Sequence, residues 1–152
     1  MNIFYLDKDP VKAAKHLYNK HVVKMVLETA QMLSTAARAQ GHDVGYKSAY
    51  PKHPMTMWVG STLENYLYAC RIGIALTEEY TKRYGKIHVC AEHLKWLYTN
   101  HPSTFTQRKS DTAYYSEEGI PECMPEEYKT KSIIQAYQMY YMMDKMGFAR
   151  YK

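Results

Sequence analysis

The segment 21–39 constrains the fold more than any other part of the sequence. Its polar residues follow one another at steps of three or four, so on a helix they form one narrow stripe. This stripe contains His21, Lys24, Glu28, Gln31 and Thr35. The rest of the circumference is apolar, and a glycine just past the segment is a typical helix terminator. A helix that is apolar over most of its girth is buried on most sides. The pattern therefore predicts a central, largely buried helix with one polar stripe.

Two further helices have recognisable start signals. Asp9 and Pro10 place a capping aspartate before a proline at the first helical position. This helix is predicted to run to about residue 20, either as a separate helix or continuous with the next one. Ser61 and Glu64 form a capping box ahead of a long helix predicted over 61–84.

The remaining segments complete the predicted architecture. Shorter helices are predicted over 90–100 and 130–146, and 41–60 is predicted to be a connection because glycines and prolines interrupt it. Residues 101–128 show no clean hydrophobic period. The sequence thus predicts an all-α fold, a compact single-domain bundle of four to five helices with a long irregular segment at about 101–128.

Length and composition restrict the class of protein. The chain has 152 residues, of which 46% are hydrophobic, which fits one globular domain spanning 1–152. Its three cysteines are too few for the disulfide framework of a small secreted protein. No apolar run approaches the ~20 residues of a membrane-spanning helix, and no signal-peptide pattern opens the sequence. We therefore expect a soluble, cytoplasmic protein with no membrane partner.

Charge and tyrosine content point to a partner. The formal net charge is +5, and the chain contains 16 tyrosines. Basic side chains bind phosphates and aromatic rings stack on bases, so this composition predicts DNA, in duplex form, as the partner. The alternative is that the charge only confers solubility and the tyrosines form a half-buried core.

The polar stripe of the central helix is the first candidate site. His21, Lys24 and Glu28 lie on successive turns, where a histidine, a lysine and a carboxylate can transfer protons and orient an anion. The alternative is a solvated strip with a Lys24–Glu28 ion pair of little energetic consequence. We predict that the three residues line the principal cavity of the protein.

A second polar group belongs to the long helix predicted over 61–84. Asn65, Glu79 and Arg83 flank its apolar face, and Lys86 follows its end. Cations near a helix C-terminus are common for electrostatic reasons alone, but such a cluster can also bind phosphate. We predict that Asn65 or the Glu79–Arg83 pair lies opposite the polar stripe.

The region around residue 90 contains residue types that bind zinc. His88, Cys90 and His93 occur within a short span, but their spacing matches no standard zinc finger. No metal or cofactor is therefore predicted. The sequence also lacks the motifs of phosphate-binding loops, serine hydrolases and zinc proteases.

Three stretches of the chain carry a resemblance to a known family. They are residues 13–17 (AAKHL), residues 54–60 (PMTMWVG) leading into a helix that ends EEYTKRYG, and a C-terminal cluster of tyrosines with Lys145. In this order and spacing the sequence resembles the phage pyrimidine-dimer DNA glycosylases of the endonuclease V type. The resemblance implies a small, basic, all-helical protein that acts on DNA, in the host cytoplasm if it is encoded by a phage.

The resemblance also implies a mechanism. In that family the N-terminal α-amine attacks the sugar of the damaged nucleotide, forms an imine and expels the base, which combines glycosylase and abasic-site lyase chemistry. Met1 is the corresponding amine here, because Asn2 disfavours removal of the methionine. His16 matches a basic active-site position, while Val23 falls near the family's catalytic glutamate and Glu28 lies further along the helix.

The residue pattern and the family resemblance together give the predicted site. Catalytic candidates are Met1, His16, His21 and Glu28. Predicted substrate contacts are Lys24, Lys47, His53, Trp58, Asn65, Glu79, Arg83 and Lys86. The lysines and the arginine are expected to bind phosphates, and Trp58 is expected to stack on bases.

Two other functions are compatible with the same polar stripe. One is a small-molecule or nucleotide-modifying enzyme in which the polar stripe lines a closed pocket. The other is a non-catalytic interaction protein in which the stripe faces bulk water. An open basic groove favours DNA, a closed pocket favours a small ligand, and a convex face favours the interaction protein.

Overall fold

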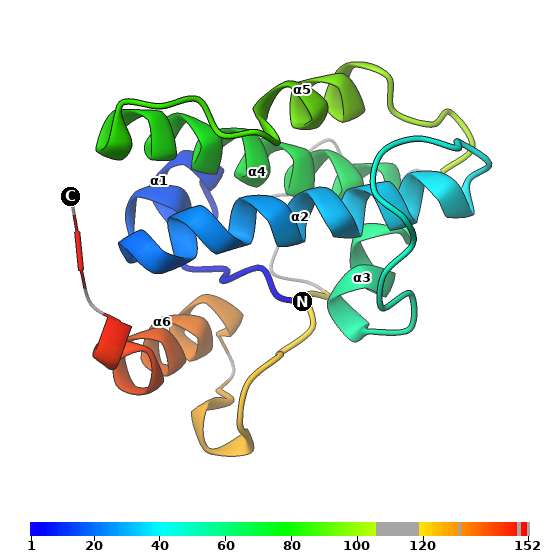
Figure 1. Ribbon diagram of the computed structural model, residues 1–152. Coiled ribbons are helices and arrows are strands. Elements are labelled where there is room, and N and C mark those ends of the chain that lie inside the picture. Colours follow the sequence, from blue (N-terminus) through cyan, green and yellow to red (C-terminus); the bar gives the residue numbers. More distant parts are fainter. Residues whose placement is uncertain (106–118, 131, 149, 152) are drawn as a thin grey trace.

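The computed structural model describes residues 1–105, 119–130, 132–148 and 150–151 (Figure 1). These residues form helices joined by irregular segments, and none of them forms a strand. The helices are α1 (Pro10–Lys15), α2 (Asn19–Ala39), α3 (Pro54–Val59), α4 (Leu63–Tyr84), α5 (Ala91–Thr99) and α6 (Ile133–Asp144), with short 3-10 helices at Glu126–Tyr128 and Met146–Phe148. The prediction of an all-α fold is confirmed.

The core lies between α2 and α4, which run side by side through the molecule (Figure 1). Helices α1, α3 and α5 pack against α4 as well. Gly73 allows this close packing, because a Cβ there would lie 3.0 Å from the Leu94 side chain and 3.1 Å from the Thr29 side chain. Most of the apolar girth of α2 is buried as predicted, with Val22 and Val26 fully inaccessible, but Val23 and Leu27 are exposed.

The boundary between the first two helices differs from the prediction. Helix α1 ends at Lys15 and α2 begins at Asn19, so a helix running to residue 20 is wrong and the two helices are separate. Arg83 of α4 provides the physical reason. Its guanidinium donates hydrogen bonds to the carbonyls of Lys15 and Leu17, at 3.1 and 2.7 Å, and so satisfies acceptors at a helix end.

Helix α3 falls within the segment predicted as a connection, and the cap of α4 also differs from the prediction. Thr62, rather than Ser61, is the N-cap of α4, because its Oγ1 accepts a hydrogen bond from the Asn65 backbone N–H at 3.1 Å. The Ser61 hydroxyl instead donates to the Trp58 carbonyl at 2.8 Å and satisfies an acceptor at the end of α3.

The N-terminal segment runs through the interior of the protein. Ile3, Phe4, Tyr5 and Leu6 are each at most 6% exposed. Figure 1 shows the N-terminus beside α2 and α3 rather than at the edge of the molecule. This burial places the first residue of the chain close to the polar stripe of α2.

The predicted irregular segment is only partly described. Residues 101–105 and 119–125 contain no helix, a 3-10 helix occupies Glu126–Tyr128, and 106–118 lie outside the described residues. Helix α6 lies within the predicted range 130–146. No helix of the described chain is long and apolar enough to cross a membrane.

Candidate active site

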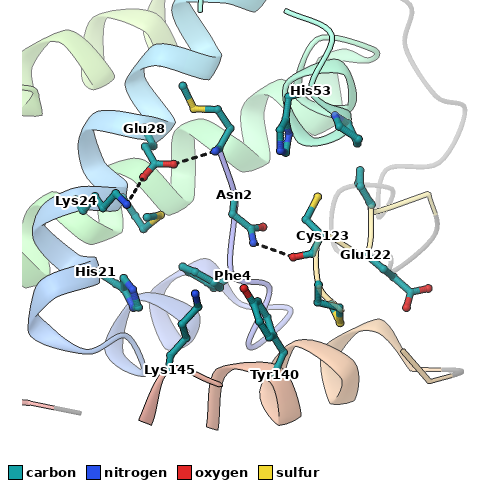
Figure 2. Close-up of a pocket in the computed structure, with 15 residues that line it drawn as sticks. Asn2, Phe4, His21, Lys24, Glu28, His53, Glu122, Cys123, Tyr140 and Lys145 are labelled. Atoms are coloured by element: carbon teal, nitrogen blue, oxygen red, sulfur yellow. Dashed lines mark hydrogen bonds and ion pairs between the residues drawn. The ribbon is translucent and has the colours of Figure 1, made fainter. Parts of the chain in front are cut away.

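The α-amine of Met1 lies against the polar stripe of α2 (Figure 2). Its nitrogen is 3.2 Å from Oε1 of Glu28, and Oε2 of the same carboxylate is 3.7 Å from Nζ of Lys24. The Met1 side chain is 4% exposed and that of Glu28 is 14% exposed, whereas that of Lys24 is 63% exposed. One carboxylate therefore bridges the α-amine of a half-buried residue and a lysine at the surface.

These groups line a cleft of about 590 Å³. Four elements contribute to it: the N-terminal segment, α2, the start of α3 and the C-terminal part of the chain. Besides the three groups above, the lining residues are Asn2, Phe4, His21, Met25, His53, Pro54, Pro121, Glu122, Cys123, Met124, Tyr140 and Lys145. The polar stripe thus lines a concave site, and His21, Lys24 and Glu28 share it.

His21 is held in a fixed and neutral state. Its Nδ1 lies 2.6 Å from the hydroxyl of Tyr141, which also accepts a hydrogen bond from a backbone N–H. The pKa of His21 is lowered to about 4, chiefly by burial and then by the positive charges of Lys145, Lys24 and Lys20. The imidazole is therefore uncharged near neutral pH, and two of the lysines whose charges act on it, Lys24 and Lys145, line the cleft.

The segment after residue 119 fixes the position of the N-terminus. The side-chain amide of Asn2 donates to the Cys123 carbonyl at 3.2 Å. The buried Tyr137 hydroxyl donates to the Pro121 carbonyl at 2.5 Å and accepts the Cys123 backbone N–H at 3.2 Å. These bonds tie the residue next to the α-amine to α6.

A comparison of the sequence with protein families identifies the family of this chain. The family model described as pyrimidine dimer DNA glycosylase matches residues 1–92, more than half of the chain. The chain belongs to the pyrimidine dimer DNA glycosylase family. This confirms the resemblance seen in the sequence and implies DNA as the substrate. No curated protein and no solved structure matches the chain.

The match covers one side of the cleft. Met1, His21, Lys24, Glu28 and His53 lie inside the matched range, whereas the cleft residues from 121 onward lie outside it. The part of the cleft inside the matched range is therefore built from the N-terminal segment, α2 and the start of α3. The C-terminal part of the chain forms its opposite wall.

The residues predicted on α4 do not face the stripe, and this corrects the prediction. Arg83 is 9% exposed and pairs with Glu79 at 3.1 Å, while its other nitrogens bind backbone carbonyls and the Asn19 side chain. Its role is to hold the α1–α2 junction against α4. In a sequence, a charged pair at the margin of an apolar helix face is as compatible with a structural contact between helices as with a ligand-binding site.

Asn65 and Trp58 are also structural. The buried Asn65 amide donates to the Trp58 carbonyl at 2.9 Å and so satisfies an acceptor at the end of α3. The Trp58 side chain is 7% exposed and meets Tyr68 edge-on, with ring centroids 6.1 Å apart. Trp58 is therefore part of the core, and the prediction that it stacks on bases is corrected.

Three further predicted residues lie outside the cleft. His16 is exposed and lines a separate cleft of about 340 Å³ together with Tyr18, Tyr141 and Tyr151. Lys47 and Lys86 are exposed on the loops after α2 and α4 and do not line the Met1 cleft.

The residues considered as zinc ligands have other partners. Tyr46 Oη lies 3.0 Å from Cys90 Sγ, and Ser34 Oγ lies 3.2 Å from Nε2 of His93. Within the described part of the chain, no group of three or more histidine, cysteine or acidic residues is arranged to hold a metal ion. This cluster attaches the loop after α2 to the helices.

Sequence reasoning missed several cleft residues. Asn2, Phe4 and Cys123 carry no local pattern that signals a site, because only the burial of the N-terminal segment brings them to α2. Tyr140 and Lys145 belong to the C-terminal cluster that carried the resemblance, and this was the one available signal.

Proposed function

We propose that this protein is a DNA glycosylase with associated abasic-site lyase activity, and that the α-amine of Met1 is its nucleophile. The observation that carries the proposal is the 3.2 Å contact between this amine and Glu28 inside a cleft. An amine is nucleophilic only when neutral, and a carboxylate at hydrogen-bond distance can take its proton.

The proposed reaction uses Glu28 twice. Glu28 first takes a proton from the ammonium group. The neutral amine then forms a bond to the sugar carbon C1′ while the bond from C1′ to the base breaks, and the base leaves with the electron pair and takes the proton from Glu28. The amine then passes a proton to Glu28, its lone pair forms the C1′=N imine, and the ring oxygen O4′ leaves and takes that proton. The imine serves as an electron sink for strand cleavage after loss of a proton from C2′.

The charges at the mouth of the cleft support duplex DNA as the substrate. Lys20 and Lys24 are exposed on α2, and Lys145 faces them from the end of α6. A basic rim around a recessed nucleophile suits a backbone whose phosphates stay outside while one nucleotide enters. The concave position of the stripe disfavours the interaction-protein alternative.

Borohydride trapping tests the proposal. We expect the protein, incubated with duplex DNA containing one abasic site, to form a covalent adduct that peptide mapping assigns to the Met1 nitrogen. Acetylation of the α-amine at mildly acidic pH, where lysine side chains remain protonated, should abolish the adduct. An adduct that survives acetylation and maps to Lys24 would overturn the assignment of Met1.

The attachment of the N-terminal segment gives a second prediction. Tyr137→Phe removes the hydroxyl that binds Pro121 and Cys123, so we expect the trapping rate to fall at least about tenfold because the amine is misplaced. Tyr66→Phe is the matched control, since it removes a buried hydroxyl bonded to the Leu97 carbonyl far from the cleft. Both variants should melt at similarly reduced temperatures, and equal trapping rates in the two would contradict the prediction.

A further inference from the structure

His53 occupies an unusual position at the start of α3. It is the N-cap residue, and its Nδ1 accepts a hydrogen bond from the Met55 backbone N–H at 3.2 Å. The same ring is half-buried and lines the cleft that contains Met1 and Glu28. Figure 2 shows His53 on the α3 side of the cleft, across the N-terminal segment from Glu28.

The cap determines which ring nitrogen carries the hydrogen. A backbone N–H can only donate, so Nδ1 must accept and is unprotonated. The neutral ring then carries its hydrogen on Nε2, the nitrogen that the cap leaves available. Adding a proton to Nδ1 would break the cap, so the capping bond favours the neutral ring.

The surroundings favour the same state. The pKa of His53 is lowered, first by burial and then by the positive charge of the Met1 amine, while Glu28 acts in the opposite direction. His21 differs in this respect, because the charges that act on it are those of Lys145, Lys24 and Lys20. His53 is therefore the cleft histidine whose neighbours are the amine and the carboxylate.

We propose that the Nε2–H of His53 is an electrophilic catalytic group that hydrogen-bonds to the sugar ring oxygen O4′ as the ring opens. This rests on the proposed function, since O4′ is bonded to the carbon that the amine attacks. When the imine forms, the C1′–O4′ electron pair moves to O4′, which receives the proton held by Glu28. His53 keeps its own proton and stabilises the developing negative charge, as a neutral imidazole can do.

Two substitutions separate the two functions of this ring. In H53N the short amide oxygen can still cap α3, but no donor reaches the position of Nε2. In H53Q the longer amide can place an N–H near that position, whereas glutamine is a poor cap. We expect H53N to keep its Tm and its affinity for abasic-site DNA but to lose about 100-fold in single-turnover trapping rate at saturating protein. We expect H53Q to melt at a lower temperature while its rate stays within about tenfold of the unsubstituted protein.

His88 provides the matched control. Its Nδ1 also accepts a backbone N–H two residues ahead, from Cys90 at 3.0 Å, but it does not line the cleft. H88N should therefore trap DNA at the unaltered rate. An unaltered rate in H53N, or an equal loss in H53N and H53Q, would overturn the role of His53 while leaving the Met1 nucleophile in place. A complete lack of adduct with the unsubstituted protein would instead overturn the proposed function, and this inference with it.

Discussion

Glu28→Gln is expected to lower the rate of borohydride trapping on abasic-site DNA by about 10²–10⁴-fold, the range typical of a general acid–base group. Glutamine has nearly the same shape, so the contact with the Met1 nitrogen persists, but an amide cannot take the proton of the ammonium group. The measurement is a single-turnover time course with the protein in excess over DNA.

The control for this variant is a second carboxylate in the same cleft. Glu122→Gln removes one negative charge from the cleft without touching the amine contact. Both variants should bind DNA slightly more tightly, because each removes a charge that repels phosphate. Only Glu28→Gln should lose trapping activity. A normal rate in Glu28→Gln would exclude Glu28 as the group that activates the amine.

Arg83→Met is expected to lower the free energy of unfolding by about 3–5 kcal/mol. The guanidinium is buried and binds the carbonyls of Lys15 and Leu17, the side chain of Asn19 and the carboxylate of Glu79. Methionine fills much of the same space but leaves a sheltered carboxylate and several acceptors without their donor. Urea unfolding followed by far-UV circular dichroism measures the change.

Two further variants test the origin of this loss. Adding Glu79→Leu to Arg83→Met should recover part of the stability, because the unpaired carboxylate is removed. Lys82→Met, on the exposed side of the same turn, should change the stability by less than about 0.5 kcal/mol. A loss of similar size in Lys82→Met would show that the helix end, rather than the buried hydrogen bonds, is what the substitution weakens.

Helix patterning alone predicted the side of the cleft that α2 supplies. The three- and four-residue steps place His21, Lys24 and Glu28 on one face whatever surrounds the helix, because the helical repeat is a local property. The apolar character of the remaining girth is equally local in origin. Gly85 ends α4 for a similarly local reason, since its backbone takes the left-handed conformation with φ of 66°.

Other predictions failed where a residue's partner is distant in sequence. The sequence predicts Arg83 as a phosphate ligand, but its acceptors include the Leu17 carbonyl, and a backbone carbonyl has no signature in a sequence. The sequence predicts Trp58 as a base-stacking residue, although it is packed in the core against Tyr68. Helix α3 was missed because its six residues are too few to show a helical period.

By itself, the sequence determined that this protein is all-helical, that α2 is largely buried with one polar face, and that the chain resembles DNA glycosylases with an amine nucleophile. Only the tertiary structure decided that the Met1 amine meets Glu28, that Asn2 is held by the segment around Cys123, and that His53 lies in the same cleft. Periodicity and caps arise from neighbours within a few residues, so they can be seen in a sequence. The cleft arises from contacts between residues far apart along the chain, which depend on how the helices pack around the buried N-terminal segment.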